Sequence, residues 1–323
     1  MGEFLEIAKV MVQPAMKLLE MCGNAIGTVY EPRHMRKITD AEVYKIKQLG
    51  NAISETDSLP ITYDNGEISM NTLNLEDFAK RAELRANYQL LREQNNIESV
   101  VGKAYQELLD APEVPSDPVD EDWTTRFFNI VKEINTEEMQ YIWSKILAGE
   151  IINPGSFSMR TLETIRNMSQ HEATIFQRIL PILLASDNDW FVLSEPDMHN
   201  KCSVTYDDIL TLDECGLMIS NGTMSITMNV SEGSAIVHNK TYCIMPVEKK
   251  EQKREFTFGI YSLTRAGKEL LEILSYEPSE TYICEVAEFL FRENPEVNLE
   301  VRKVQKIEDN IVCTTGEIIK EYH

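Results

Sequence analysis

WSKILAGEIINPGSFSMRTLETI, residues Trp143–Ile165, contains two apolar helical segments separated by a loop with the turn sequence Asn-Pro-Gly. Gly149 lies near the end of the first segment, and the second segment begins after the Pro154-Gly155 turn. A phosphate-binding loop needs a Gly-rich turn that follows a strand, whereas these glycines follow a helical pattern and Lys145 lies within it. The stretch therefore predicts a capped helical corner.

Segments on both sides of this corner continue the helical pattern. Upstream, Trp123 and Phe127 share one apolar face, and Thr136 is placed as the N-cap of the helix that leads into the corner. Downstream, Ser169 and Glu172 form the spacing of a capping box. These signals predict three antiparallel helices joined by short loops.

Composition limits the function classes that the chain can serve. With 31 Lys and Arg against 53 Asp and Glu, the 323-residue chain has a net charge of −22 and a pI near 4.7. Such a balance argues against broad contact with nucleic-acid backbone or anionic lipid, although a local basic patch stays open. The six cysteines are widely spaced, which predicts reduced thiols in a cytoplasmic protein. No apolar run reaches the roughly 18 residues of an ordinary membrane span.

The N-terminal stretch has the pattern of an amphipathic helix, since its apolar residues recur at three- and four-residue steps. This pattern predicts a core or oligomer-forming face, and the alternative is a peripheral membrane face with basic residues nearby at Arg33, Arg36 and Lys37. The residues assigned to the oligomer or membrane face are Phe4, Ile7, Met11 and Leu18.

Four segments follow from the patterning along the chain. Residues 50–66 are rich in turn formers and predict a linker or exposed loop, and the Pro- and carboxylate-rich run at residues 111–122 predicts a stiff linker. The predicted segments are N-terminal amphipathic helices (1–49), a helical segment (50–112), a central helical domain (113–186) and a C-terminal α+β domain (187–323).

The C-terminal segment changes in character. YDDILTLDECGLM predicts a short helix with a Gly stop, MSITMNV alternates as a strand does, and EFTFGIYSLTRAGKELLEIL predicts a strand that passes through Thr264 into a helix. VNLEVRKV and NIVCTTGEIIKEY predict a closing β-hairpin. Helix, strand, strand and helix follow each other as in a winged helix. The predicted fold class is therefore mainly α with a C-terminal α+β, winged-helix-like domain.

Candidate ligand-binding residues lie at the helical corner. Lys145, Arg160 and Arg166 supply positive charge near the start of a helix, where an anion can bind. The favoured alternative is that Arg160 pairs with Glu150 or Glu163 and stabilises the corner, because charged groups near helix ends usually serve the helix.

No catalytic, metal or cofactor site emerges from the remaining motifs. The five histidines lie outside recognisable catalytic motifs, and the cysteines form no close pair of the kind that structural zinc sites use. Asp197 followed by Glu248, Lys249 and Lys250 formally matches a metal-dependent nuclease pattern, which is the weakest alternative.

DNA binding by the winged-helix-like segment is the second alternative. The helix at 206–215 carries only acidic charges, which repel phosphate, while Arg265 and Lys268 on the later helix are offset by neighbouring glutamates. We therefore expect this segment to contact protein, and we do not expect a nucleic-acid partner.

Three stretches resemble the signature of an uncharacterised bacterial family that is catalogued only as a domain of unknown function. They are Trp143–Ser169, AIGTVYEPRHMRK near the N-terminus, and DDILTLDECGL with YSLTRAGKEL near the C-terminus. Relatives are proposed to act in abortive infection or anti-phage defence, and the resemblance carries over no catalytic residue. It implies a non-enzymatic sensor, scaffold or membrane-acting effector of a prokaryotic defence system. Such a component would form a homo-oligomer through its N-terminal helices and contact a partner protein from the same locus.

Overall fold

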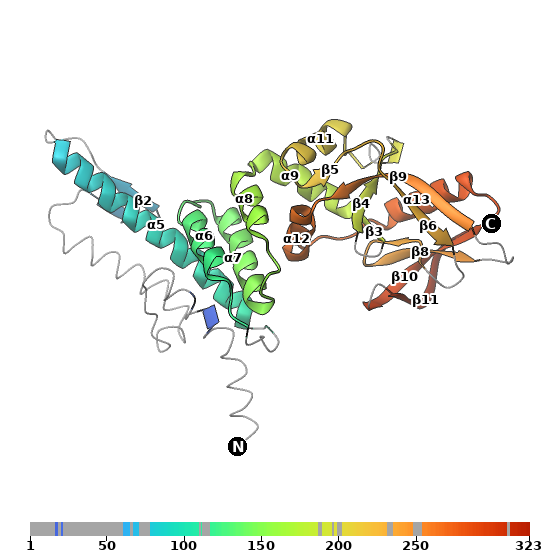
Figure 1. The fold of residues 1–323 in the computed structure, drawn as a ribbon, viewed down its shortest axis with the longest axis horizontal. Helices are drawn as coiled ribbons and strands as arrows, with labels where there is room; N and C mark the ends of the chain where they lie inside the picture. The colour runs from blue at the N-terminus through green and yellow to red at the C-terminus, as the bar shows by residue number, and fades with distance from the viewer. Residues whose placement is uncertain are drawn as a thin grey trace, which may run out of the picture. The chain divides into compact units, whose positions relative to one another are not determined.

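The computed structural model of the protein divides the chain into two units, Met1–Met159 and Arg160–His323 (Figure 1). This division falls inside the predicted central segment 113–186, and the predicted segment boundaries stay predictions. The residues that the structure describes are 17, 18, 21, 61–64, 67–70, 78–109, 111, 117–186, 189–195, 197–198, 202–230, 235–247, 254–308 and 311–323.

The first unit is built on α5 (Phe78–Leu109), a 32-residue helix that is about 48 Å long at the rise of an α-helix. Two shorter helices, α6 (Glu121–Val131) and α7 (Glu137–Ile152), contact α5. The antiparallel hairpin of β1 (Ile61–Asp64) and β2 (Glu67–Met70) also belongs to this unit. The predicted helices are confirmed here, whereas the loop predicted for residues 50–66 is wrong at β1.

Aromatic side chains form the centre of this unit, as the apolar stripes predicted. The rings of Trp123 and Phe127 are stacked with centroids 5.0 Å apart, and Phe127 lies 5.6 Å from the ring of Trp143. All three side chains are buried. Asp120 starts α6 by accepting the Trp123 backbone N–H at 2.8 Å. Because α6 carries its aromatics on one face, it can cover α7 without exposing them.

Three helix ends of the second unit lie at the residues that sequence signals predict. Ser169 and Glu172 form the expected capping box, and Gly216, at φ +77°, ends the 206–214 helix. Thr264 caps the 265–273 helix by accepting the Gly267 N–H at 3.1 Å. The helical elements are α8 (Met159–Asn167), α9 (Gln170–Ile179), the 3₁₀ turn η1 (Leu180–Ile182), α11 (Tyr206–Glu214), α12 (Arg265–Ile273) and α13 (Glu280–Glu293).

An antiparallel sheet of nine strands, counted over the described residues, fills the rest of this unit. The strand order is β11-β10-β8-β7-β3-β4-β9-β5, and β6 pairs with the other end of β9. The strands are β3 (Leu184–Ser186), β4 (Asp189–Leu193), β5 (Met218–Ile219), β6 (Ser225–Val230), β7 (Val237–His238), β8 (Tyr242–Val247), β9 (Arg254–Leu263), β10 (Asn298–Glu308) and β11 (Ile311–Tyr322).

The middle strands of this sheet are buried on both faces. Successive residues of β3, β4 and β8 are buried, so these strands lack the alternation that marks a strand with one face in water. Helix α13 contacts β8, β10 and β11. The protein is thus a mixed α and β protein whose sheet is larger than the strands that the sequence predicted.

Candidate functional site

A buried carboxylate organises the helical corner. Glu150, which is 1% exposed, accepts hydrogen bonds from the backbone N–H groups of Gly155 at 2.6 Å and Phe157 at 2.9 Å. The hydroxyl of Ser156 donates to the same carboxylate at 3.4 Å. The loop therefore wraps around the side chain of the helix that precedes it, and its buried N–H groups are satisfied by a charged acceptor.

Close packing explains Gly149 at the corner, and the backbone conformation explains Gly155. A Cβ atom on Gly149 would lie 2.8 Å from the ring of Phe157, and Gly155 has a φ of +87°, which favours glycine. The indole N–H of Trp123 donates to the Phe157 carbonyl at 2.8 Å. These contacts agree with the interpretation of the stretch as a helical corner.

The three predicted anion-binding residues are distributed over the two units. Lys145, in the first unit, lies with its ammonium 5.0 Å from the centre of the Tyr141 ring. In the second unit, Arg166 pairs with Glu163 at 3.9 Å and Arg160 is exposed. Because these residues belong to different units, the anion site stays a prediction.

Of the four residues assigned to the oligomer or membrane face, the structure describes Leu18. Leu18 is fully buried within the single chain, while Phe4, Ile7 and Met11 lie outside the described residues. Next to Leu18, the ammonium of Lys17 donates to the Ile151 carbonyl at 3.3 Å. Burial lowers the pKa of Lys17, against the opposing effect of the Asp117 and Glu150 carboxylates. Leu18 would have to be uncovered before it could contact a membrane or another subunit.

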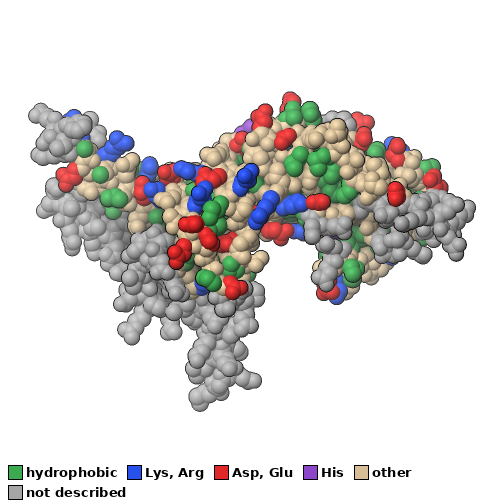
Figure 2. All heavy atoms as spheres, in the orientation of Figure 1, with side chains coloured by type: hydrophobic (Ala, Val, Ile, Leu, Met, Phe, Trp, Pro, Cys, Tyr) green, Lys and Arg blue, Asp and Glu red, His purple; other side chains and the backbone are tan. Residues whose placement is uncertain are grey.

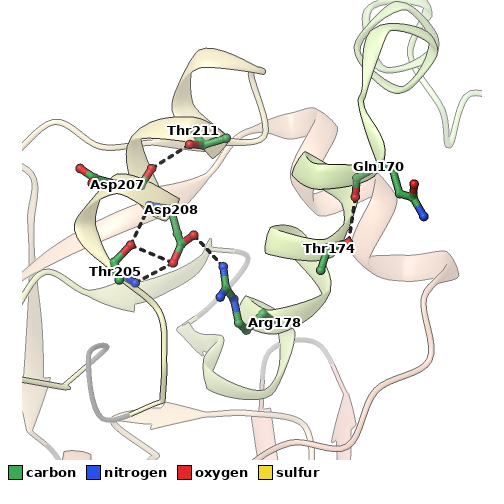
Figure 3. A network of polar contacts seen from close by, with 7 residues as sticks. All are labelled: Gln170, Thr174, Arg178, Thr205, Asp207, Asp208 and Thr211. Atoms are coloured by element: carbon green, nitrogen blue, oxygen red, sulfur yellow. Dashed lines mark hydrogen bonds and ion pairs between the residues drawn. The ribbon is translucent and has the colours of Figure 1, made fainter.

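Acidic side chains of α11 form polar contacts within the second unit (Figure 3). The guanidinium of Arg178, on α9, bonds Asp208 at 2.6 Å. The other carboxylate oxygen of Asp208 accepts the N–H of Thr205 at 2.8 Å and its hydroxyl at 2.9 Å. Asp213 accepts the hydroxyl of Ser220 beyond the end of the helix. Asp208 and Asp213, two of the acidic residues whose charge makes DNA binding by α11 unfavourable, thus form hydrogen bonds within the unit.

The two cations proposed for DNA binding are paired with carboxylates. Arg265 bonds Glu269 at 2.5 Å and Lys268 bonds Asp189 at 2.6 Å. In Figure 2, basic and acidic side chains both occur on the described part of the face drawn. Phosphate contacts by these two side chains would first have to break the ion pairs.

In the part of the chain that the structure describes, the residues of the nuclease pattern do not form a metal site. Asp197 is exposed, and the predicted partners at residues 248–250 lie outside the described residues. Over the described residues, no three His, Cys, Asp or Glu side chains are grouped as a metal ion requires.

A surface hollow that the sequence did not predict lies in the second unit. Its volume is about 480 Å³, within the range of small-molecule sites. The walls come from the β7–β8 turn and from the segment between α12 and α13. The lining residues are Lys240, Thr241, Leu274, Ser275, Tyr276, Glu277 and Pro278.

Lys240 is held in an uncommon conformation at the edge of this hollow. Its φ is +72°, and its ammonium lies 3.7 Å from Glu272 and 5.1 Å from the centre of the Trp190 ring. The buried amide of Asn239 fixes the turn, because its oxygen accepts the Tyr242 N–H at 2.8 Å. Its nitrogen donates to the Ser279 carbonyl at 3.5 Å, which joins the two walls.

Two titratable groups beside Lys240 are shifted by burial. Burial, assisted by the Lys240 charge, lowers the pKa of His238 to about 4. Burial also raises the pKa of Tyr276 to about 12, with the Glu272 charge as the smaller cause. The Tyr276 hydroxyl has no hydrogen-bond partner among the described residues. The hollow is thus lined by the Lys240 ammonium, the Glu277 side chain and the Tyr276 side chain, which is neutral at neutral pH, whereas His238 is buried and is not one of the lining residues.

The comparisons with known proteins identify a family whose function is unknown. A family model described as "Protein of unknown function (DUF2806)" matches residues 80–287. Neither a curated protein nor a solved structure matches the chain. Of the helices that the structure describes, none is both long and apolar enough to cross a membrane.

Proposed function

The chain belongs to this family, whose function is unknown, and we propose from its sequence resemblance and its own surfaces that it is a non-enzymatic sensor of a prokaryotic anti-phage defence system. The sensor binds an infection-derived small ligand or partner through its C-terminal unit. It assembles through its N-terminal helices, and the oligomer is cytoplasmic.

The hollow beside Lys240 is the observation that carries the binding role. Lys240 and Glu277 supply charge to its lining, Leu274 and Pro278 supply apolar wall, and Asn239 fixes the turn that carries Lys240. This open hollow, with its polar and apolar lining, is the candidate surface for a small ligand or partner. By contrast, Glu150, Asp208 and Asp213 have structural bonds that a catalytic role would have to break.

The defence role rests on the resemblance of the Trp143–Ser169 stretch and its flanking motifs. A sensor of this kind needs two states that differ by a few kcal/mol, so that ligand binding can shift the population. The buried Leu18 supports such a switch, because the stripe to which it belongs is covered at this position. In the proposed active state this stripe contacts another subunit or the membrane surface.

The winged-helix-like segment is proposed as the surface for a partner protein from the same locus. Helix α11 and the start of α12 are joined directly, since the Thr264 hydroxyl donates to the Gly216 carbonyl at 2.6 Å. Asp207 and Glu214 are exposed on α11. An acidic helix of fixed orientation suits a basic protein surface better than DNA.

Plaque formation tests the proposed function. A panel of phages is plated on cells that carry the gene in its native locus and on cells that lack it. We expect fewer plaques for at least one phage when the gene is present, and loss of protection for the double variant Ile7→Asp, Met11→Asp. Equal plaquing with and without the gene across a broad panel would contradict the defence role.

A further inference from the structure

We propose that Lys17 is a latch that holds the N-terminal apolar stripe on the helical corner, and that opening of this latch frees Leu18 and Met21 for the oligomer seam. This inference rests on the assembly proposed above and names the contact that regulates it. It follows from the hydrogen bonds of the last turn of α7, from the surroundings of Lys17 and from the burial of the two apolar side chains that follow it.

In the last turn of α7, the usual donor to the Ile151 carbonyl is used elsewhere. In an α-helix this carbonyl accepts the N–H four residues further on, which here belongs to Gly155. The Gly155 N–H instead donates to the Glu150 carboxylate at 2.6 Å. Ile151 is fully buried, and a buried carbonyl needs a donor. The corner therefore creates an acceptor for a group from outside the helix.

Lys17 supplies that donor from a distant part of the chain. Its ammonium donates to the Ile151 carbonyl at 3.3 Å, across 134 positions of sequence, and a cation is favourable at the C-terminal end of a helix. Burial is the largest influence on the pKa of Lys17 and lowers it, whereas the Asp117 and Glu150 carboxylates raise it. Formation of the bond therefore costs desolvation of the ammonium, and this cost is recovered when the bond opens.

Two apolar side chains are covered where this bond forms. Leu18 is fully buried and Met21 is 8% exposed. Both residues are helical and lie three positions apart, so they share one face of the helix. A contact made of a half-buried polar bond and a short apolar face can open locally while the rest of the unit stays folded.

Hydrogen–deuterium exchange of the full chain, followed by mass spectrometry, tests the latch. Lys17→Met removes the donor and should make the peptide that contains residues 17–21 exchange about fivefold faster, while the peptides of α5 keep their wild-type rate. Lys17→Arg, which keeps the positive charge and the donors, should exchange within about twofold of the wild type. Lys145→Met makes the same substitution at a half-buried lysine of α7 and should leave the exchange of residues 17–21 unchanged.

Asp117→Asn keeps the test valid if Lys17→Met does not fold. Asp117 is exposed, and loss of its charge should speed exchange at residues 17–21 about twofold. If these residues exchange at the wild-type rate in whichever of the two variants fold, the latch is overturned, because apolar packing alone then holds the segment. An equal rise in the exchange of α5 also overturns it, since Lys17 would then stabilise the whole unit.

Light scattering over a range of protein concentrations tests what the latch controls. Lys17→Met should assemble at a concentration about threefold lower than the wild type needs, because Leu18 and Met21 are free for a larger fraction of the time. Faster exchange with unchanged assembly would refute the regulated release.

The double variant Ile7→Asp, Met11→Asp separates failure of the latch from failure of the proposed assembly. If the double variant still assembles, the N-terminal seam is wrong even where Lys17→Met speeds exchange. If the double variant is monomeric and Lys17→Met leaves exchange unchanged, the seam stands and the latch does not.

Discussion

At the scale of single residues, Glu150 makes the helical corner depend on one buried carboxylate. Glu150→Gln keeps the size of the side chain but directs an amide NH₂ group at the N–H donors of Gly155 or Phe157. We expect the free energy of unfolding to fall by about 2 kcal/mol, since one buried donor loses its acceptor. Urea unfolding followed by circular dichroism measures the change.

Glu163→Gln is the matched control for this variant. Glu163 pairs with Arg166 at 3.9 Å, and both side chains are about two-fifths exposed. The control should change the free energy of unfolding by less than about 0.5 kcal/mol. Equal effects of the two substitutions would show that the Glu150 carboxylate does not hold the loop.

The lowered pKa of His238 predicts that the free energy of unfolding falls in mild acid. Its pKa is about 4 in the folded chain and about 6.5 when unfolded, so the unfolded chain binds more protons between these values. Above pH 6.5 this contribution is fully present, and it is lost as the pH falls towards 4. The whole effect amounts to about 3 kcal/mol.

Unfolding in urea at several pH values checks this contribution. His238→Gln should have a flatter dependence of the free energy of unfolding on pH between 6.5 and 4 than the wild type has. Parallel profiles for the two proteins would mean that the buried imidazole does not resist protonation.

At the scale of elements, Asp208 joins α9 to α11 and caps α11 at the same time (Figure 3). Asp208→Ala removes both contacts and should lower the free energy of unfolding by about 1–2 kcal/mol. Arg178→Met removes only the ion pair and should cost less than about 1 kcal/mol. Thermal unfolding of the two single variants and the double variant gives the coupling between the residues.

Asp207→Ala is the control for the neighbouring charge. The Asp207 side chain is exposed, and its backbone carbonyl, which accepts the Thr211 hydroxyl at 2.8 Å, is retained in the variant. Its unfolding temperature should match the wild type. If Asp207→Ala lowered the unfolding temperature as much as Asp208→Ala does, the stabilisation would come from negative charge near the start of α11 and not from the cap formed by Asp208.

Helices were more predictable than strands, for reasons visible in particular residues. Ser169, Gly216 and Thr264 mark helix ends through local chemistry, and the structure uses each of them as predicted. In the sequence, β3 and β4 form an apolar stretch after Pro181 that shows no strand pattern. Both faces of these strands are buried, so apolar and polar residues do not alternate with a period of two. Strand β6, in which Ser225 and Thr227 are exposed and Ile226 is half-buried, kept its alternation and was predicted.

At the scale of the whole molecule, the hollow escaped prediction because its walls are distant in the sequence. Lys240 and Tyr276 meet through the pairing of β7 with β8 and the bond from Asn239 to Ser279. The sequence around Lys240 contains only a turn-forming Asn as a local signal. Glu150 was predicted, together with Glu163, only as a possible partner of Arg160, because hydrogen bonds from backbone N–H groups to a side chain leave no residue pattern.

Assembly of the whole chain provides the last prediction. The proposed oligomer seam contains Ile7 and Met11, and Leu18 of the same predicted stripe is buried within the single chain. Replacing Ile7 and Met11 with Asp puts two charges into the seam, where an unpaired charge costs several kcal/mol. Light scattering should therefore give the mass of an oligomer for the wild type and of a 37.0 kDa monomer for the double variant. Leu90→Asp, at a side chain of α5 that is 64% exposed, should stay oligomeric. A monomeric wild type, or an oligomer that only Leu90→Asp dissociates, would show that the N-terminal stripe does not form the oligomer interface.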